Sequence, residues 1–176
     1  VNPSRSGFFT ALKRFGYQVE ILRRKERQGD AVGDIDVKFS RNRQSRKLGA
    51  ETMQASELQY PLLSVGACYA EGESILRDIP LETKSQITEL HQLVSQLKIT
   101  GAEVGEFDEG LVIRGREECD SGDYDGNVNP RIALALYILC QTTHGQSNFK
   151  GIAEINTYYS EVPELIEKLQ VSKDRS

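Results

Sequence analysis

The sequence predicts an α+β protein in which helices pack on small sheets. Segments with apolar residues at helical spacing alternate with segments in which every second residue is apolar. Glycines and charged turns separate these segments. The order helix, strand, helix and hairpin recurs at about 60 residues, which is typical of an internally repeated architecture.

The helices are predicted from apolar spacing and from the residues at their ends. The first covers residues 6–15, because Phe8, Leu12 and Phe15 fall on one face. Gly16 follows it, and glycine is the residue that most often ends a helix. The same reasoning predicts further helices near residues 61–70, 85–98, 131–141 and 163–169.

Strands are predicted where polar and apolar residues alternate. A charged turn at Gly29 joins the first two strands, and residues 108–110 join a later pair into a hairpin. The polar stretch 116–127 is predicted to form a loop. The predicted strands are residues 17–22, 33–39, 74–79, 104–107 and 111–114, with a further strand region within 146–155.

The composition predicts a single domain with a hydrophobic core. The chain has 176 residues, of which 38% are hydrophobic, and we expect a folded region over 1–171 and a polar tail over 172–176. No apolar run approaches the roughly 18 residues of a membrane helix, and no signal-peptide pattern opens the chain. Cys68 and Cys140 lie in apolar helical stretches and are predicted to be core thiols, which fits a cytoplasmic protein. With 2 histidines, we expect no metal site and no other cofactor.

Positive charge is concentrated in the first part of the chain. Residues 1–50 hold 12 of the 22 Lys and Arg but 5 of the 26 Asp and Glu, a local net charge of +7 against −4 for the whole chain. Two basic clusters, residues 23–27 and 41–47, are predicted to lie in turns. No aromatic residue interleaves with them, so we favour a solvated face over a nucleic-acid surface. An anionic partner surface is the alternative.

The sequence contains none of the common motifs of nucleotide-binding, hydrolase or calcium-binding sites considered below. It has neither the glycine-rich loops of nucleotide-binding proteins nor the Gly-x-Ser-x-Gly turn of hydrolases. Asp120, Asp123 and Asp125 lie close together, but the EF-hand pattern needs a glycine at its sixth position and a glutamate at its twelfth, and this stretch has neither. We therefore favour a solvated acidic loop.

A single arginine stands at the start of a helix that is predicted to be buried. No charge occurs from Ile132 to Cys140, so most sides of this helix are expected to face the core. Pro130 suits a first helical position, and Asn129 can cap the helix. Arg131 at such an end can hold an anion, because the unpaired amides and the helix dipole favour negative charge. On position alone, a solvated arginine is the favoured interpretation.

Six short motifs follow one another along the chain, at residues 2–7, 32–35, 60–63 with 70–72, 101–104, 110–115 and 131–135. They occur in the order found in the EPSP synthase (3-phosphoshikimate 1-carboxyvinyltransferase) family, and the chain resembles the C-terminal half of these enolpyruvyl transferases. The resemblance implies βαβαββ units, three to a lobe, with two lobes closing on the substrates. This chain would be most of one lobe, without the other lobe and without the strand expected before Asn2.

The resemblance also implies a reaction. The family transfers the enolpyruvyl group of phosphoenolpyruvate to shikimate 3-phosphate and releases phosphate, as part of aromatic amino acid biosynthesis. Such chemistry needs an acid–base pair and cations that hold two anionic substrates. Phosphoenolpyruvate, shikimate 3-phosphate and an N-terminal lobe or second chain are therefore the implied partners.

Most of the family's ionisable site residues are replaced in this chain. The family's aspartate, three residues before the proline of its helix start, aligns with Leu58. An ungapped register places Ser85 at the family's lysine, Gln86 at its glutamate and Glu89 at its arginine. A one-residue slip lets Lys84 serve as the lysine. These changes remove proton-transfer groups and reverse one charge.

Two later family motifs are only partly kept. The Asp-His-Arg triplet reads Asn129, Pro130, Arg131, so Arg131 and Asn129 are the candidate substrate-binding residues, together with Lys84. The family's late lysine aligns with Ser160. We therefore expect no intact catalytic set.

Three functions are consistent with these residues. The favoured one is a degenerate, catalytically inactive lobe. The second is a working fragment of a two-lobe transferase that needs its missing lobe. The third is a binding module that uses the basic face over residues 23–47 for an anion or a protein partner.

Overall fold

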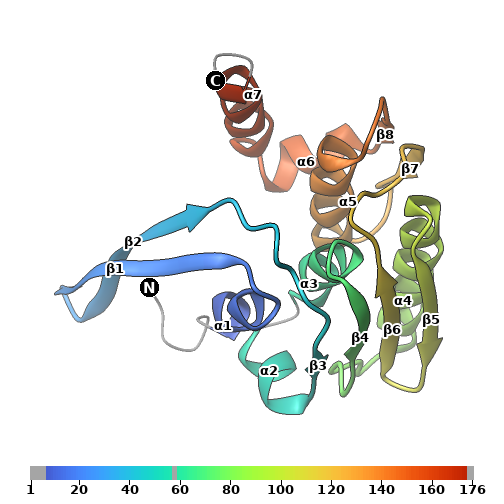
Figure 1. Cartoon of the computed structure of the whole chain (residues 1–176), viewed down its shortest axis with the longest axis horizontal. Helices are drawn as coiled ribbons and strands as arrows, with labels where there is room; N and C mark the ends of the chain where they lie inside the picture. The colour runs from blue at the N-terminus through green and yellow to red at the C-terminus, as the bar shows by residue number, and fades with distance from the viewer. Residues whose placement is uncertain (1–6, 57–58, 174–176) are drawn as a thin grey trace.

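The structure is a computed structural model that describes residues 7–56 and 59–173. Within this part of the chain, the strands form three small sheets with helices packed against them (Figure 1). β1 (Gln18–Arg27) and β2 (Asp30–Lys38) form the first sheet, and β7 (Asp123–Asp125) and β8 (Asn148–Lys150) form the last.

The middle of the chain forms one complete βαβαββ unit. Its strands lie in the order β3-β4-β6-β5. β3 and β4 are parallel, whereas β6 is antiparallel to both of its neighbours. The predicted α+β class with this repeat is confirmed. The elements are β3 (Lys47–Leu48), α3 (Tyr60–Cys68), β4 (Gly72–Leu76), α4 (Lys84–Leu97), β5 (Glu103–Phe107) and β6 (Gly110–Gly115).

Half-units of the same repeat flank this complete unit. The first consists of α1 (Gly7–Arg14) and the β1–β2 hairpin, which is the second half of the repeat. The last begins with β7, α5 (Pro130–Thr142) and the parallel strand β8, which is the first half. α6 (Ile152–Tyr158) and α7 (Val162–Lys173) follow. The division into residues 1–171 and a tail stays a prediction.

α3 lies at the centre of the hydrophobic core. All of its residues except one are buried, which is why this segment carries no charge. α5 packs against α3 and contributes Leu136 and Leu139, both 0% exposed. The end of α3 lies so close to β6 that Gly115 leaves no room for a side chain. A Cβ atom there would be 2.2 Å from the carbonyl oxygen of Ala70.

The five predicted helices are confirmed as α1, α3, α4, α5 and α7, with ends that differ by a few residues. The predicted strands before residue 116 are confirmed as β1, β2, β4, β5 and β6. Cys68 and Cys140 are buried free thiols, as predicted, and Cys119 is a third. The apolar periodicity was sufficient for most of these elements because they bury one continuous face, whereas α3 was indicated by its largely apolar run.

Two predictions in the last third are wrong. The region 146–155 forms a strand only at β8 and then becomes the helix α6. Gly151, at φ 105°, turns the chain in the left-handed region, and Ile155 is 0% exposed in the helix that follows. The predicted loop 116–127 contains β7, which pairs with β8. The partner strand β8 is distant from β7 in the sequence, so the local pattern of polar residues did not predict β7.

Two features of the first third also differ from expectation. The basic cluster at residues 23–27 lies within β1 rather than in a turn, because β1 and β2 form a longer hairpin than the alternation predicts. The short helix α2 (Ala50–Ala55) was not predicted, and Met53, 2% exposed, anchors it in the core.

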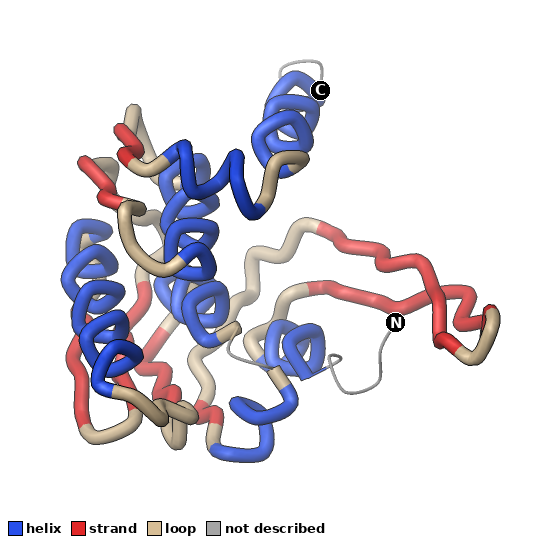
Figure 2. Tube along the Cα trace, turned by 180° about the vertical axis from the view of Figure 1, so that it is seen from behind, coloured by secondary structure: helices blue, strands red, loops and turns tan. Residues whose placement is uncertain are grey.

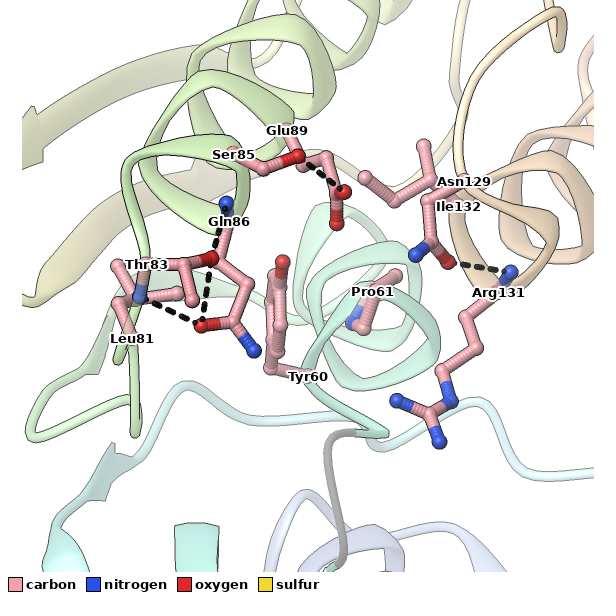
Figure 3. Close-up of a pocket in the computed structure, with 10 residues that line it drawn as sticks. All are labelled: Tyr60, Pro61, Leu81, Thr83, Ser85, Gln86, Glu89, Asn129, Arg131 and Ile132. Carbon is pink, nitrogen blue, oxygen red and sulfur yellow. Dashed lines mark hydrogen bonds between the residues drawn. The ribbon is translucent and has the colours of Figure 1, made fainter.

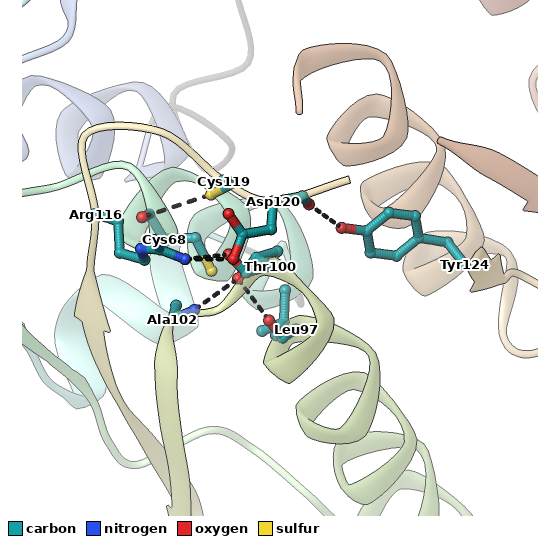
Figure 4. A network of polar contacts seen from close by, with 8 residues as sticks. All are labelled: Cys68, Leu97, Thr100, Ala102, Arg116, Cys119, Asp120 and Tyr124. Atoms are coloured by element: carbon teal, nitrogen blue, oxygen red, sulfur yellow. Dashed lines mark hydrogen bonds and ion pairs between the residues drawn. The ribbon is translucent and has the colours of Figure 1, made fainter. Parts of the chain in front are cut away.

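A polar network that runs from the buried Thr100 to the exposed Arg116 and Asp120 orders the stretch after β6 (Figure 4). The hydroxyl of Thr100 donates to the carbonyl of Leu97 at 2.7 Å, and the carbonyl of Thr100 accepts from the Asp120 amide at 2.9 Å. The guanidinium of Arg116 bonds both the Thr100 carbonyl and the Asp120 carboxylate. Tyr124 donates its hydroxyl to the carbonyl of Asp120. Asp120 therefore serves a structural contact in this stretch.

Residues 7–56 and 59–173 contain neither a membrane-spanning helix nor a metal-binding cluster. No helix there is both long enough and apolar enough to cross a membrane. No group of three or more His, Cys, Asp or Glu residues there is arranged to hold a metal ion.

Candidate functional site

A hollow of about 240 Å³ lies where the first turns of α3, α4 and α5 meet (Figure 3). Three helix N-termini thus converge on one space, and each carries a partial positive charge from its unpaired amides. The lining residues are Tyr60, Pro61, Leu81, Thr83, Ser85, Gln86, Glu89, Asn129, Arg131 and Ile132. They come from segments that are tens of residues apart in the sequence.

Arg131 and Asn129 form the α5 side of the hollow. The side-chain oxygen of Asn129 accepts from the backbone amide of Arg131 at 2.9 Å, so Asn129 caps the helix. The side chain of Arg131 is exposed, and among the described residues it has no ion-pair partner. Figure 3 shows its guanidinium well apart from the carboxylate of Glu89. This cation is therefore available to a ligand.

Gln86 belongs to the cap of α4. Its side-chain oxygen accepts from the amides of Glu82 at 2.7 Å and Thr83 at 2.9 Å. The backbone amide of Gln86 donates to the hydroxyl oxygen of Thr83, which completes a capping box. Ser85 donates its hydroxyl to the carboxylate of Glu89 at 3.2 Å. The polar groups on the α4 side are thus largely bonded to one another.

The capping box gives a stability prediction. We expect Thr83→Ala to lower the free energy of unfolding by about 0.5–2 kcal/mol, because the Gln86 amide loses its acceptor. Urea unfolding followed by circular dichroism measures this change. Thr88→Ala in the same helix is the control, because the Thr88 hydroxyl only bonds the Lys84 carbonyl one turn back. Equal losses in the two variants would contradict a role for the cap.

Tyr60 is a site residue that the sequence reasoning missed. Its side chain is 6% exposed and lies between the α4 and α5 sides of the hollow. The pKa of Tyr60 is raised to about 12, mainly by burial and also by the charge of Glu89, while the charge of Arg131 acts in the opposite direction. Tyr60 is therefore a neutral hydroxyl at ordinary pH. Its place before Pro61 at a helix start was the available signal.

No protein-family model matches the chain. It is 31% identical over 150 residues to the 3-phosphoshikimate 1-carboxyvinyltransferase of Synechococcus sp. (strain WH7803), over 85% of this chain. It is 28% identical over 169 residues to the protein of the same name from Persephonella marina (strain DSM 14350 / EX-H1). An EPSP synthase structure from Acinetobacter baumannii superposes on 96% of the chain with a TM-score of 0.84 at 21% identity. Over most of its length, the chain is therefore similar to one part of the EPSP synthases.

Coverage of these relatives is partial. The chain spans 34% of the Synechococcus relative and 39% of the Acinetobacter EPSP synthase structure. The fold also matches the enolpyruvyl transferase NikO from Streptomyces tendae, with a TM-score of 0.70 at 17% identity over 37% of that protein. The chain thus carries about a third of an EPSP-synthase-type polypeptide.

The structure brings together five of the predicted EPSP-synthase-like site positions. Ser85, Gln86, Glu89, Asn129 and Arg131 all line the hollow. Glu89 and Arg131 thus share one space, although no ion pair joins them in the described part of the chain.

The other predicted site residues are not part of the hollow. Lys84 is exposed at the first position of α4 and is not a lining residue, so the slipped register does not place a lysine there. Ser160 is exposed in the turn between α6 and α7. Leu58 lies outside the described residues.

The chemistry available in the hollow is limited. Its lining offers one guanidinium, one carboxylate, neutral hydroxyls and two amides. Neither lysine nor histidine occurs among the described lining residues. Such a set can hold an anion through Arg131 and the helix ends, but it offers few groups that exchange protons.

Proposed function

We propose that this EPSP-synthase-family lobe binds a phosphate-bearing anion in the hollow and does not transfer an enolpyruvyl group by itself. The observation that carries the proposal is the pairing of a free guanidinium with three converging helix N-termini, next to the neutral side chains of Ser85 and Gln86. A guanidinium binds phosphate oxygens in bidentate fashion, and helix amides add further donors. Phosphoenolpyruvate and shikimate 3-phosphate, the substrates implied for the family, both carry this group.

Gln86 and Ser85 are the reason to expect no enolpyruvyl transfer by the chain. A general acid or base typically contributes about 10²–10⁴-fold to a rate, and the family's glutamate and lysine positions hold neutral side chains here. The oxygen of Gln86 is also occupied by the backbone amides of the cap. Glu89 places a negative charge near the space where an anion would sit, which weakens binding.

A phosphate-release assay tests this proposal. With phosphoenolpyruvate and shikimate 3-phosphate, we expect no release above background from the purified chain, because its proton-transfer positions are neutral. The Synechococcus relative, assayed in parallel, is the positive control. Shikimate-3-phosphate-dependent turnover by the chain would overturn the proposal.

The second candidate is a working part of a two-lobe transferase. Partial coverage of the relatives and the two half-units at the ends of the described chain favour it. Adding the unmatched part of the Synechococcus relative to the assay distinguishes the candidates. Activity that requires both polypeptides supports a working part of a two-lobe transferase. Absence of activity in the mixture supports an inactive lobe. Gln86→Glu is a useful variant in both mixtures, because glutamate also completes a capping box.

The basic face is the less favoured binding site. Arg43 lies over the ring of Tyr69, 5.5 Å from its centroid, and donates to the carbonyl of Glu117. Arg46 donates to the Ser45 carbonyl and the Gln44 side chain. These two arginines of the second cluster therefore serve local structure. Binding of an anionic partner by the first cluster stays a prediction that salt-dependent binding tests.

A further inference from the structure

The hollow holds two opposite charges that do not neutralise each other. Glu89 comes from the second turn of α4, and Arg131 comes from the first turn of α5. Within residues 7–56 and 59–173, neither side chain has an ion-pair partner, although both line the same space of about 240 Å³. Figure 3 shows the two charged groups on different sides of this space.

Glu89 is the less expected of the two charges. Its side chain is half-buried, and in the described part of the chain its carboxylate accepts one hydrogen bond, from the Ser85 hydroxyl at 3.2 Å. A carboxylate that is partly shielded from water normally has a cation beside it, because burial of an unpaired charge is costly. Lys84 begins the same helix but does not line the hollow. The helix N-termini offset only part of this cost.

Tyr60 shows that both charges act on one small region. Burial has the largest effect on the pKa of Tyr60 and raises it, the charge of Glu89 raises it as well, and the charge of Arg131 lowers it. Both charges therefore lie within electrostatic reach of the same hydroxyl. A ligand beside Tyr60 thus meets a positive charge from α5 and a negative charge from α4.

The most basic element of the chain lies elsewhere. Figures 1 and 2 show the β1–β2 hairpin extending away from the helices. The basic cluster at residues 23–27 belongs to β1, and none of the described lining residues of the hollow comes from this hairpin. The cation that Glu89 lacks can therefore be supplied by a ligand.

We propose that the hollow takes a phosphate monoester that also carries a primary ammonium group, in other words a small aminoalkyl phosphate. Its phosphate end is held by Arg131 and the helix amides, so the inference rests on the proposed function. Its ammonium group donates to the carboxylate of Glu89. Pro61, Leu81 and Ile132 supply apolar surface for the short alkyl chain between the two ends.

The charges in the hollow disfavour a ligand with a second anionic group. The carboxylate of phosphoenolpyruvate would share the space with Glu89, and like charges repel. Inorganic phosphate uses Arg131 but leaves Glu89 without a cation. An ammonium group replaces this repulsion by attraction. The ligand still keeps a net negative charge, which the helix N-termini favour.

The test compares 2-aminoethyl phosphate with n-propyl phosphate, which has a methyl group in place of the ammonium group. NMR titrations that follow the amides of residues 85–89 and 129–133 give both affinities. We expect 2-aminoethyl phosphate to bind about fivefold tighter, which is the upper end for an exposed ion pair, because Glu89 is half-buried.

Glu89→Gln should remove this preference. It should weaken the binding of 2-aminoethyl phosphate and tighten the binding of n-propyl phosphate, because the attraction and the repulsion come from the same carboxylate. Glu82→Gln is the matched control, because Glu82 is exposed just before α4 and does not line the hollow. It should keep the preference. Thermal unfolding shows whether both variants retain the fold.

The outcomes distinguish the ammonium contact from phosphate binding itself. Equal affinity for the two esters, or a preference that survives Glu89→Gln, would overturn the inference and leave phosphate binding in the hollow intact. If neither ester shifts residues 129–133, the inference and the proposed function are both wrong. Glycerophosphoethanolamine, the diester of a lipid headgroup, should bind more weakly, because its phosphate carries less charge. Binding as tight as that of the monoester would make a lipid headgroup the ligand.

Discussion

Replacing Arg131 by glutamine should abolish the response of the hollow to millimolar phosphate. In the unmodified chain, a phosphate titration followed by NMR should shift the amides of residues 129–133 and of the first turns of α3 and α4. A charge-assisted contact is worth about 1.5–3 kcal/mol, so by itself it supports only weak binding. Its loss lowers the affinity by roughly 10- to 150-fold. Arg131→Lys is the informative companion, because it keeps the charge but loses the bidentate geometry.

The control for this prediction is Glu89→Gln. Glu89 lines the same hollow, and its carboxylate opposes an anion there, so its removal should tighten phosphate binding. The substitution can keep the hydrogen bond from Ser85, because the side-chain oxygen of glutamine accepts from the same hydroxyl. Shifts confined to residues 23–47, with residues 129–133 unmoved, would show that the basic face is the anion site. Arg131 would then be a structural remnant.

The second large effect is a loss of stability in alkali. Burial raises the pKa of Tyr17 and of Tyr60 to about 12, and it raises the pKa values of Tyr69 and Tyr124 as well. Below pH 10 these hydroxyls are protonated in both the folded and the unfolded chain. Above pH 10 the unfolded chain releases protons that the folded chain keeps, so stability falls as the pH rises toward 12.

The magnitude makes this effect easy to measure. Each such tyrosine contributes up to about 1.4 kcal/mol per pH unit, and a domain has only about 5–15 kcal/mol of stability. Urea unfolding from pH 8 to 11 should show a steep decline. Cys68, whose pKa burial also raises, acts in the same direction from about pH 9.

Two variants separate the tyrosine effect from general alkaline damage. Tyr124→Phe should make the decline with pH shallower, because one buried hydroxyl no longer titrates. Tyr158→Phe should leave the slope unchanged, because Tyr158 is 61% exposed. Stability that stays level up to pH 11 would mean that the buried tyrosines ionise within the folded protein.

The candidate site was partly predictable from local signals. Arg131 and its Asn129 cap follow from a proline and an uncharged run at a helix start, and both line the hollow. The role of Gln86 was also readable, because Thr83 followed three residues later by glutamine is a capping-box pattern. The resemblance directed attention to Gln86 as a lost acid, whereas the structure shows what it bonds instead.

By itself, the sequence determined the helices and hairpins that bury one continuous face, because their periodicity depends on neighbouring residues alone. It also indicated the similarity to EPSP synthases, through motifs in a fixed order. The presence of β7, α6 and the hollow became clear only from the tertiary structure, because each depends on residues that are distant in the chain. β7 needs β8, α6 needs the turn at Gly151 and a place for Ile155, and the hollow needs three helix starts to converge. Such contacts are set by packing of the whole core, which local patterns do not encode.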